Sequence, residues 1–257
     1  MLDLLPGREA KPRNSGVTMV MDKGIGIREA QDLAETAGPL IDFLKLGFGT
    51  SYVSQKVKEK VKIYQSHNIK VYVGGTLLEA FLVRGQFEDY LHYIDNLGCD
   101  AAEVSDGCIK LSSEEKCRII EQLTKHYTVV SEIGAKEAGI IMEAEEWISS
   151  MRNELDAGSS FVIGEARESG TVGIYGKNGS ADVALIEQIL EHIPAKKIIW
   201  EAPLKQQQTW FIRLLGAGVN LGNIAPTEIV ALETLRLGLR GDTFFDFLPE
   251  DFKKFKL

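Results

Sequence analysis

Five charged residues stand inside or at the end of short apolar runs that are typical of buried strands. They are Lys45, Glu103, Glu132, Glu165 and Glu201. Strands of a parallel sheet are buried on both faces and are expected to be almost purely apolar. A buried charge without a partner is too costly to keep, so these groups must pair with one another, bind a metal ion or bind a ligand. An internal lattice of ion pairs or a solvated rim is the alternative without catalytic meaning.

Glycine-containing turns follow most of these runs. They include Asp22-Lys23-Gly24, Gly47-Phe48-Gly49, Gly74-Gly75-Thr76, Ser105-Asp106-Gly107, Gly134-Ala135-Lys136, Ala166-Arg167-Glu168-Ser169-Gly170 and Leu221-Gly222-Asn223. Glycine lets backbone amides approach an anion closely, and the N-terminus of a following helix adds a favourable dipole. The set favours binding of a phosphate or a carboxylate.

The charges and turns are positioned by eight strand-like runs that alternate with eight helical patterns. The strands are predicted at Val17–Met21, Ile41–Leu46, Ile69–Val73, Ala101–Ser105, Tyr127–Ile133, Ser160–Glu165, Lys197–Glu201 and Val219–Leu221. The helices are predicted at Ile27–Ala37, Val53–Ser66, Phe87–Leu97, Glu114–Lys125, Ala144–Asp156, Asp182–His192, Gln206–Leu215 and Thr227–Leu237. This alternation predicts a parallel sheet closed into a single (β/α)8 TIM barrel, whose catalytic residues stand at the C-terminal strand ends.

A doubly wound open sheet is the alternative fold. The turn after the first strand, Gly24-Ile25-Gly26, lacks the third glycine of a dinucleotide-binding turn, which weakens that alternative. We expect one domain over residues 1–257, with an N-terminal arm at 1–15. The phenylalanine-rich tail at 243–257 is expected to cap the barrel or to meet another subunit, so a homo-oligomer is expected.

Composition excludes several classes of function. The net charge of −8 argues against a nucleic-acid partner, although a local group of lysines and arginines can still bind a small anion. The sequence has no apolar run of the ~20 residues that cross a bilayer and no pattern of a secretion signal, so neither a membrane partner nor export is expected. The expected location is cytoplasmic.

Several blocks together resemble the phosphosulfolactate synthase family. They are Arg13-Asn14-Ser15-Gly16, Lys45-Leu46-Gly47-Phe48-Gly49-Thr50-Ser51, Gly74-Gly75-Thr76-Leu77-Leu78-Glu79, Glu103-Val104-Ser105-Asp106-Gly107, Ser131-Glu132-Ile133-Gly134-Ala135-Lys136, Glu165-Ala166-Arg167-Glu168-Ser169-Gly170, Trp200-Glu201-Ala202-Pro203 and Val219-Asn220-Leu221-Gly222-Asn223-Ile224. The resemblance runs from about Pro12 to Gly238. It implies an enzyme, a carbon–sulfur lyase, that adds sulfite to phosphoenolpyruvate with Mg²⁺ and forms (2R)-phospho-3-sulfolactate. The family serves coenzyme M biosynthesis in methanogens and sulfolactate formation in some sporulating bacteria.

The residues suit that chemistry. Attack of sulfite on C3 of the enol phosphate places negative charge on the carboxylate, and C2 then needs a proton. We predict Lys136 as the general acid, with Lys45 as the alternative or as the group that holds sulfite. Mg²⁺ is expected on Glu103 and Glu132, with Glu165 and Glu201 as supporting carboxylates.

Substrate binding is predicted for Arg167, Ser105, Asp106, Gly222 and Asn223. A guanidinium suits a two-oxygen anion, and in many barrels a phosphate lies by the loops after strands seven and eight. Two other functions stay open at this point. One is an aldolase that forms a Schiff base through Lys45 or Lys136, and the other is a catalytically inactive barrel that acts as a binding or assembly module.

Overall fold

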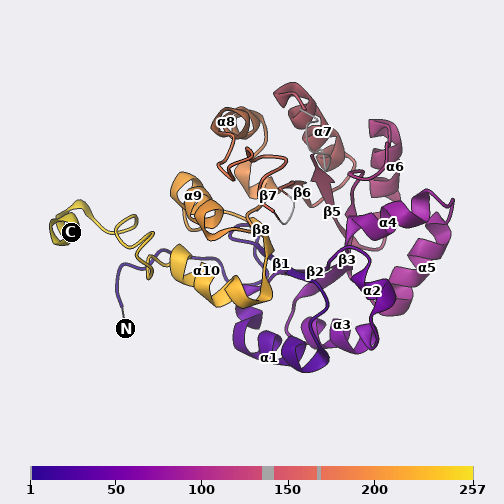
Figure 1. Ribbon diagram of the computed structural model, residues 1–257, viewed down its shortest axis with the longest axis horizontal. Coiled ribbons are helices and arrows are strands. Elements are labelled where there is room, and N and C mark those ends of the chain that lie inside the picture. Colours follow the sequence, from indigo (N-terminus) through magenta and orange to yellow (C-terminus); the bar gives the residue numbers. More distant parts are fainter. Residues whose placement is uncertain (1, 135–141, 167–168, 257) are drawn as a thin grey trace.

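The computed structural model describes residues 2–134, 142–166 and 169–256. Eight parallel strands form a ring with helices outside it (Figure 1). The strands are β1 Thr18–Asp22, β2 Phe43–Leu46, β3 Lys70–Val73, β4 Ala101–Val104, β5 Thr128–Ile133, β6 Phe161–Gly164, β7 Ile198–Glu201 and β8 Leu221–Ile224. The single (β/α)8 TIM barrel predicted from the sequence is confirmed.

The helices of the described residues follow the predicted alternation with two additions. They are α1 Ile27–Ala37, α2 Thr50–Val53, α3 Val57–Gln65, α4 Gly75–Leu82, α5 Phe87–Leu97, α6 Ser113–Leu123, α7 Ala144–Asp156, α8 Val183–His192, α9 Lys205–Leu215 and α10 Ile229–Arg236. Short 3₁₀ turns lie at Gly38–Leu40, Ala195–Lys197, Pro226–Glu228 and Glu250–Phe255. No helix in the described ranges is long and apolar enough to cross a membrane.

Three elements differ from the prediction by more than the shifts of one or two residues found at other element ends. The helix expected at Val53–Ser66 is two helices, α2 and α3, because Ser54 is extended and Lys56 has a φ of 59°. Helix α4 was missed, because two glycines open it and glycine is a poor helix former.

The last strand is Leu221–Ile224 instead of Val219–Leu221, so it begins two residues later and ends three residues later than predicted. Gly222 and Asn223 therefore belong to β8 and not to the turn after it. A Cβ on Gly222 would lie 2.8 Å from Ile199 Cγ2 and from Met19 Cε. Glycine is needed here for close packing inside the barrel.

The ring has a seam between β3 and β4. Every other neighbouring pair of strands forms a parallel ladder, and β3 and β4, which are both fully described, are the two ends of the sheet order. One backbone hydrogen bond crosses the seam, from Asp100 N to Val71 O at 3.3 Å. Side chains cross it as well, because Asp100 Oδ1 accepts from Val71 N at 2.7 Å and Glu103 Oε1 accepts from Gly75 N at 2.7 Å.

The apolar core has two parts. Inside the ring, buried side chains from alternate strand positions pack on one another, among them Met19, Phe43, Tyr72, Phe161 and Ile199. The larger part lies between the strands and the helices, where the outward-facing strand residues are covered. Large side chains fill the barrel interior below the strand ends, and a cavity opens above them.

The arm and the tail lie on the same side of the molecule. Arg8 of the arm donates to Gly16 O, at 2.7 Å, and to Leu40 O, at 3.1 Å, and its guanidinium pairs with Glu233. The tail extends away from the ring in Figure 1 and does not cover the barrel. Arm and tail enclose an apolar cavity of about 640 Å³ whose lining includes Leu4, Leu239, Phe244, Phe252 and Phe255. Contact of the tail with another subunit stays a prediction.

Candidate active site

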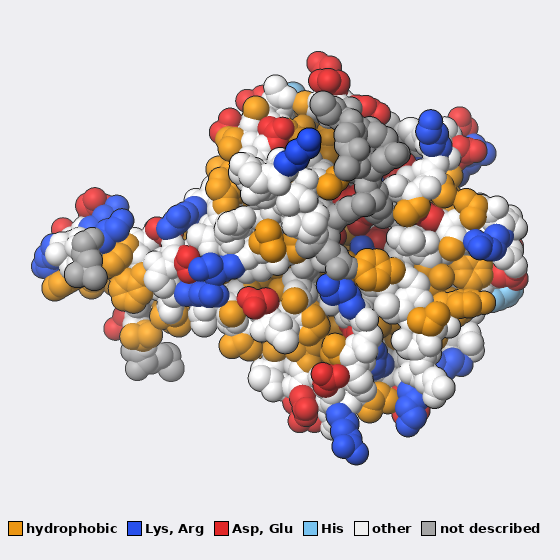
Figure 2. All heavy atoms as spheres, viewed as in Figure 1, with side chains coloured by type: hydrophobic (Ala, Val, Ile, Leu, Met, Phe, Trp, Pro, Cys, Tyr) orange, Lys and Arg blue, Asp and Glu red, His pale blue; other side chains and the backbone are white. Residues whose placement is uncertain are grey.

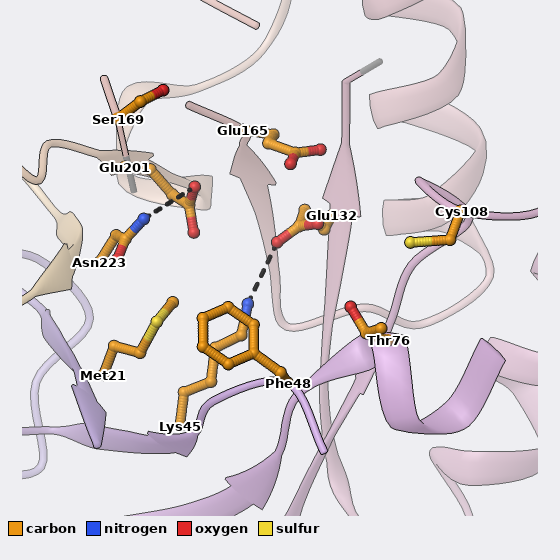
Figure 3. Close-up of a pocket in the computed structure, with 10 residues that line it drawn as sticks. All are labelled: Met21, Lys45, Phe48, Thr76, Cys108, Glu132, Glu165, Ser169, Glu201 and Asn223. Atoms are coloured by element: carbon orange, nitrogen blue, oxygen red, sulfur yellow. Dashed lines mark hydrogen bonds and ion pairs between the residues drawn. The ribbon is translucent and has the colours of Figure 1, made fainter. Parts of the chain in front are cut away.

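A cavity of about 410 Å³ opens at the C-terminal ends of the strands. Figure 2 shows charged side chains recessed near the middle of the face that Figure 1 views end-on. Ten described residues line it, and Figure 3 draws them: Met21, Lys45, Phe48, Thr76, Cys108, Glu132, Glu165, Ser169, Glu201 and Asn223. Four of the five charged residues that the sequence placed at strand ends therefore line one cavity.

Lys45 is the cation at the floor of this cavity. It extends from β2 across the barrel interior, where its Nζ lies 2.9 Å from Glu103 Oε1 and 3.2 Å from Glu132 Oε2. Figure 3 shows the ammonium pointing at Glu132, and Phe48 lines the same cavity. Burial by itself lowers the pKa of Lys45, but the carboxylates of Glu103, Glu132 and Glu201 outweigh it and hold this pKa well above its usual range. The ammonium is a permanent charge in the working pH range.

The two predicted metal ligands lie at different depths. Glu132, on β5, lines the cavity, and its Oε2 contacts Lys45. Glu103, on β4, is fully buried, and its Oε1 forms an ion pair with Lys45 and accepts a hydrogen bond from Gly75 N. Glu103 therefore supports the floor of the cavity from below.

Glu201 ends β7 on the opposite side of the cavity from Cys108 and Thr76 (Figure 3). Its Oε2 accepts from Ala166 N at 3.0 Å and from Asn223 Nδ2 at 3.4 Å. Burial raises the pKa of Glu201 to about 7, and the negative charge of Glu132 adds to the effect. At neutral pH this carboxyl group can therefore hold or release a proton.

Two of the predicted substrate-binding residues have other partners in the structure. Ser105 is fully buried, and its hydroxyl donates to Glu79. Asp106 follows it in the loop between β4 and α6, and its Oδ1 lies 2.9 Å from Lys116 Nζ. Neither side chain is among those that line the cavity.

Glu79 is a site-supporting residue to which the sequence gave no role. It lies on α4, is 1% exposed, and accepts from Gly107 N at 3.1 Å and from Cys108 N at 2.8 Å. These two backbone amides thus donate to the carboxylate of Glu79 and not toward the cavity. The signal in the sequence was a glutamate in the apolar run that follows the predicted turn Gly74-Gly75-Thr76.

Phe48 is a second residue that the sequence did not single out. It lines the cavity in a left-handed backbone conformation, with a φ of 53°. A residue of this kind is seldom found there, and such strain gathers at functional sites. Gly74 lets the main chain of Phe48 approach closely, because a Cβ at position 74 would lie 2.7 Å from Phe48 N.

The remaining predicted residues divide into two groups. Lys136 and Arg167 lie outside the described residues. Gly222 and Asn223 lie side by side on β8, and Asn223 lines the cavity with a φ of 55°. The structure thus brings Lys45, Glu132, Glu201 and Asn223 together.

The residues present fit a magnesium ion. Carboxylates of Glu132, Glu165 and Glu201 line the cavity, and Mg²⁺ prefers oxygen ligands and keeps several waters. Among the described residues no group of three or more histidine, cysteine, aspartate or glutamate side chains is arranged as a complete metal centre. One or two carboxylates are enough for Mg²⁺, so this donor set is compatible with it.

Comparison with known proteins identifies similar sequences over most of the chain. Residues 6–242 match the sequence model of the family described as (2R)-phospho-3-sulfolactate synthase (ComA). A phosphosulfolactate synthase of Methanothermobacter thermautotrophicus is 44% identical over 93% of this chain and 95% of its own length. Phosphosulfolactate synthases of Bacillus subtilis and Methanocaldococcus jannaschii are 37% and 40% identical, over 94% and 89% of this chain and 97% and 94% of their own lengths.

Solved structures share the fold at much lower identity. The YdjI aldolase from Escherichia coli K12 has a TM-score of 0.57 at 10% identity, over 85% of this chain and 78% of its own. The 3-hexulose-6-phosphate synthase from Salmonella typhimurium has a TM-score of 0.53 at 13% identity, over 87% of this chain and 100% of its own. These likenesses concern the barrel alone.

Proposed function

Because the chain belongs to the (2R)-phospho-3-sulfolactate synthase family, we propose that it adds sulfite to phosphoenolpyruvate and forms (2R)-phospho-3-sulfolactate. The observation that carries the proposal is the match to family and relatives across nearly the whole chain. The charged cavity at the strand ends supports it, because both substrates and the product are anions. A cytoplasmic location and the absence of a nucleic-acid or membrane partner belong to the same proposal.

The first step forms a bond between the sulfur of sulfite and C3 of phosphoenolpyruvate. The π electrons of the C2–C3 bond move onto C2 and the carboxylate, which becomes enediolate-like. Lys45 is suited to this step as a fixed positive charge, since its pKa is held high and its ammonium lies at the cavity floor. A charge that is already oriented stabilises the developing anion without reorganisation.

The second step delivers a proton to C2. An ammonium with a strongly raised pKa is a poor acid, so Lys45 is the weaker of the two lysine candidates. We therefore keep Lys136 as the proposed general acid. Glu201 has a pKa of about 7 and faces the same cavity, so it is suited to hold the proton in reserve.

We propose that Mg²⁺ binds at Glu132, which lines the cavity, with Glu103 below it as the second predicted ligand. Glu165 and Glu201 are the neighbouring carboxylates. When bound, the ion would stabilise the negative charge on the substrate carboxylate. Lys45 keeps the side chain of Glu132 turned toward the cavity. Glu103 in turn orients Lys45.

Substrate binding is proposed for Arg167, Gly222 and Asn223 at the β6 and β8 ends of the cavity. Asn223 supports this best, because it lines the cavity while its amide contacts Glu201. Ser105 and Asp106 are proposed to act through the shape of their loop, since their side chains already bind Glu79 and Lys116. An Arg167→Lys variant should raise KM for phosphoenolpyruvate and leave folding stability nearly unchanged.

The decisive experiment is direct. The purified protein is incubated with phosphoenolpyruvate, sulfite and Mg²⁺, and the phosphorus-containing product is followed by ³¹P NMR. We expect phosphosulfolactate to appear, and to be absent when sulfite is omitted or when a Lys45→Met variant replaces the protein. No product over a range of pH and metal concentration would overturn the proposed function.

A further inference from the structure

Lys116 is a buried lysine outside the cavity wall whose ammonium is shared among three acceptors. It lies on α6 and is 4% exposed. Its Nζ lies 2.9 Å from Asp106 Oδ1, 2.8 Å from Glu154 Oε1 and 2.7 Å from the main-chain oxygen of Glu132. An ammonium has three protons to donate, so these contacts use its full capacity.

The three acceptors come from three elements that border the site. Asp106 belongs to the loop between β4 and α6, Glu154 to α7, and Glu132 to the carboxyl end of β5. Along β5 the side chains alternate, so Glu132 faces the barrel interior while Ser131 faces the helices. Lys116 therefore contacts the main chain of Glu132 from the helix side of the sheet, while the carboxylate of the same residue lines the cavity.

Packing alone does not explain this charge. Neighbouring positions in the same layer are filled by fully buried apolar residues, Ile120 and Leu123 on α6 and Met151 on α7. Burial lowers the pKa of Lys116, but Glu154 and Asp106 more than compensate and raise it, so the ammonium stays charged. A buried ion pair is often no more stable than well-packed apolar side chains, so its presence points to a need for fixed geometry.

We propose that Lys116 is a positioning residue for the reaction, which holds the main chain of Glu132 and the loop at Asp106 in the arrangement that the cavity requires. The inference rests on the proposed function. Glu79 holds the same loop from the opposite side, through Gly107 N and Cys108 N. The loop is thereby fixed between two buried charges, one on α4 and one on α6.

The test separates geometry from stability. Lys116→Met leaves Glu154 buried without its cation and should lower both Tm and kcat. The double variant Lys116→Met/Glu154→Gln removes both charges, so its Tm should return to within a few degrees of the wild type. Its kcat should stay at least tenfold below the wild type. Ile120→Ala, one turn further along α6, is the control that should lower Tm and leave kcat unchanged below the melting range.

A second measurement does not depend on activity. In the double variant, hydrogen exchange of the peptide over 105–112 should be faster than in the wild type, while exchange in α9 and α10 stays the same. Recovery of kcat to within twofold in the double variant, or unchanged exchange of the loop, would overturn the proposal, and so would a double variant that cannot fold. An inactive wild type with the expected change in exchange would instead count against the proposed function alone.

Discussion

Two effects oppose each other at Lys45, because burial in the barrel favours the neutral amine while the proposed role needs the charged ammonium. Glu103 and Glu132 keep the side chain charged, because each carboxylate lies within 3.2 Å of the ammonium. The same pairing makes Lys45 unsuited to Schiff-base chemistry, which needs a neutral amine. An aldolase mechanism through this lysine is therefore disfavoured.

Replacement of Lys45 by methionine should abolish most activity. We expect kcat to fall at least 100-fold, about 2.7 kcal/mol, because a fixed positive charge is lost where negative charge develops. The free energy of unfolding should fall by about 3 kcal/mol, since two buried carboxylates lose their cation. Steady-state kinetics and urea unfolding measure the two effects. A kcat within threefold of the wild type would remove Lys45 from the mechanism.

Glu201 predicts a pH dependence of stability. Its folded pKa of about 7 lies above the ordinary value of 4.5, so the folded state holds the proton more tightly than the unfolded state. This contribution is fully present below pH 4.5 and is lost as the pH rises through 7. At about 1.4 kcal/mol per pH unit it amounts to roughly 3 kcal/mol.

Comparison with Glu201→Gln isolates that effect, because glutamine does not titrate. Urea unfolding without metal, between pH 4.5 and 7.5, should show the stability of the wild type falling relative to the variant. A constant difference across this range would mean that Glu201 stays ionised in the folded protein.

At the scale of elements, the junction between β3 and α4 depends on Gly75. A Cβ there would lie 2.2 Å from Ser105 Oγ and 2.9 Å from Glu103 Oε1. Gly75→Ala should therefore cost about 1–3 kcal/mol of stability and reduce kcat, because it displaces Glu103 and the β4 loop. Gly218→Ala is the matched control, since nothing lies within 4 Å of a Cβ at that position. Equal effects of the two substitutions would contradict the argument.

The order of strands and helices could be predicted because buried parallel strands and amphipathic helices repeat along the chain with different periods. Two of the errors fell where a glycine has a tertiary role, and the third fell where Ser54 and Lys56 interrupt a helix. Gly222 belongs to a strand because the barrel interior leaves no room for a side chain there, and Gly75 opens a helix against Glu103. Contacts between segments far apart in the sequence determine whether such a glycine lies in a strand, a helix or a turn. A local sequence pattern does not reveal these contacts.

The same limit applies to the site. Charged residues at strand ends gave Lys45, Glu132, Glu165 and Glu201 correctly as neighbours of one cavity. Their partners could not be predicted, because Lys116 and Glu79 reach the site from helices, where a charged residue ordinarily faces solvent. Ser105 and Asp106 were predicted as substrate ligands for the same reason, because the sequence pattern does not indicate their helical partners Glu79 and Lys116.

At the scale of the whole molecule, the tail exposes several large apolar side chains. Phe244, Phe252 and Phe255 are 48%, 40% and 69% exposed. We predict that the tail meets another subunit, so Phe252→Asp/Phe255→Asp should shift the protein to a smaller species in sedimentation velocity. Val183→Asp, an exposed position on α8, is the control. A monomeric wild type would contradict the prediction.

The seam between β3 and β4 gives the barrel an unusual kind of closure. Elsewhere the ring is closed by main-chain ladders, which every residue except proline can form. Here much of the joining falls to the carboxylates of Asp100 and Glu103, which bind Val71 N and Gly75 N. A substitution leaves the main-chain hydrogen bonds of a ladder largely unchanged, but it can remove a contact that a side chain makes. A single substitution at Asp100 or Glu103 can therefore remove a contact across the seam, and at Glu103 it would also change the floor of the cavity at Lys45.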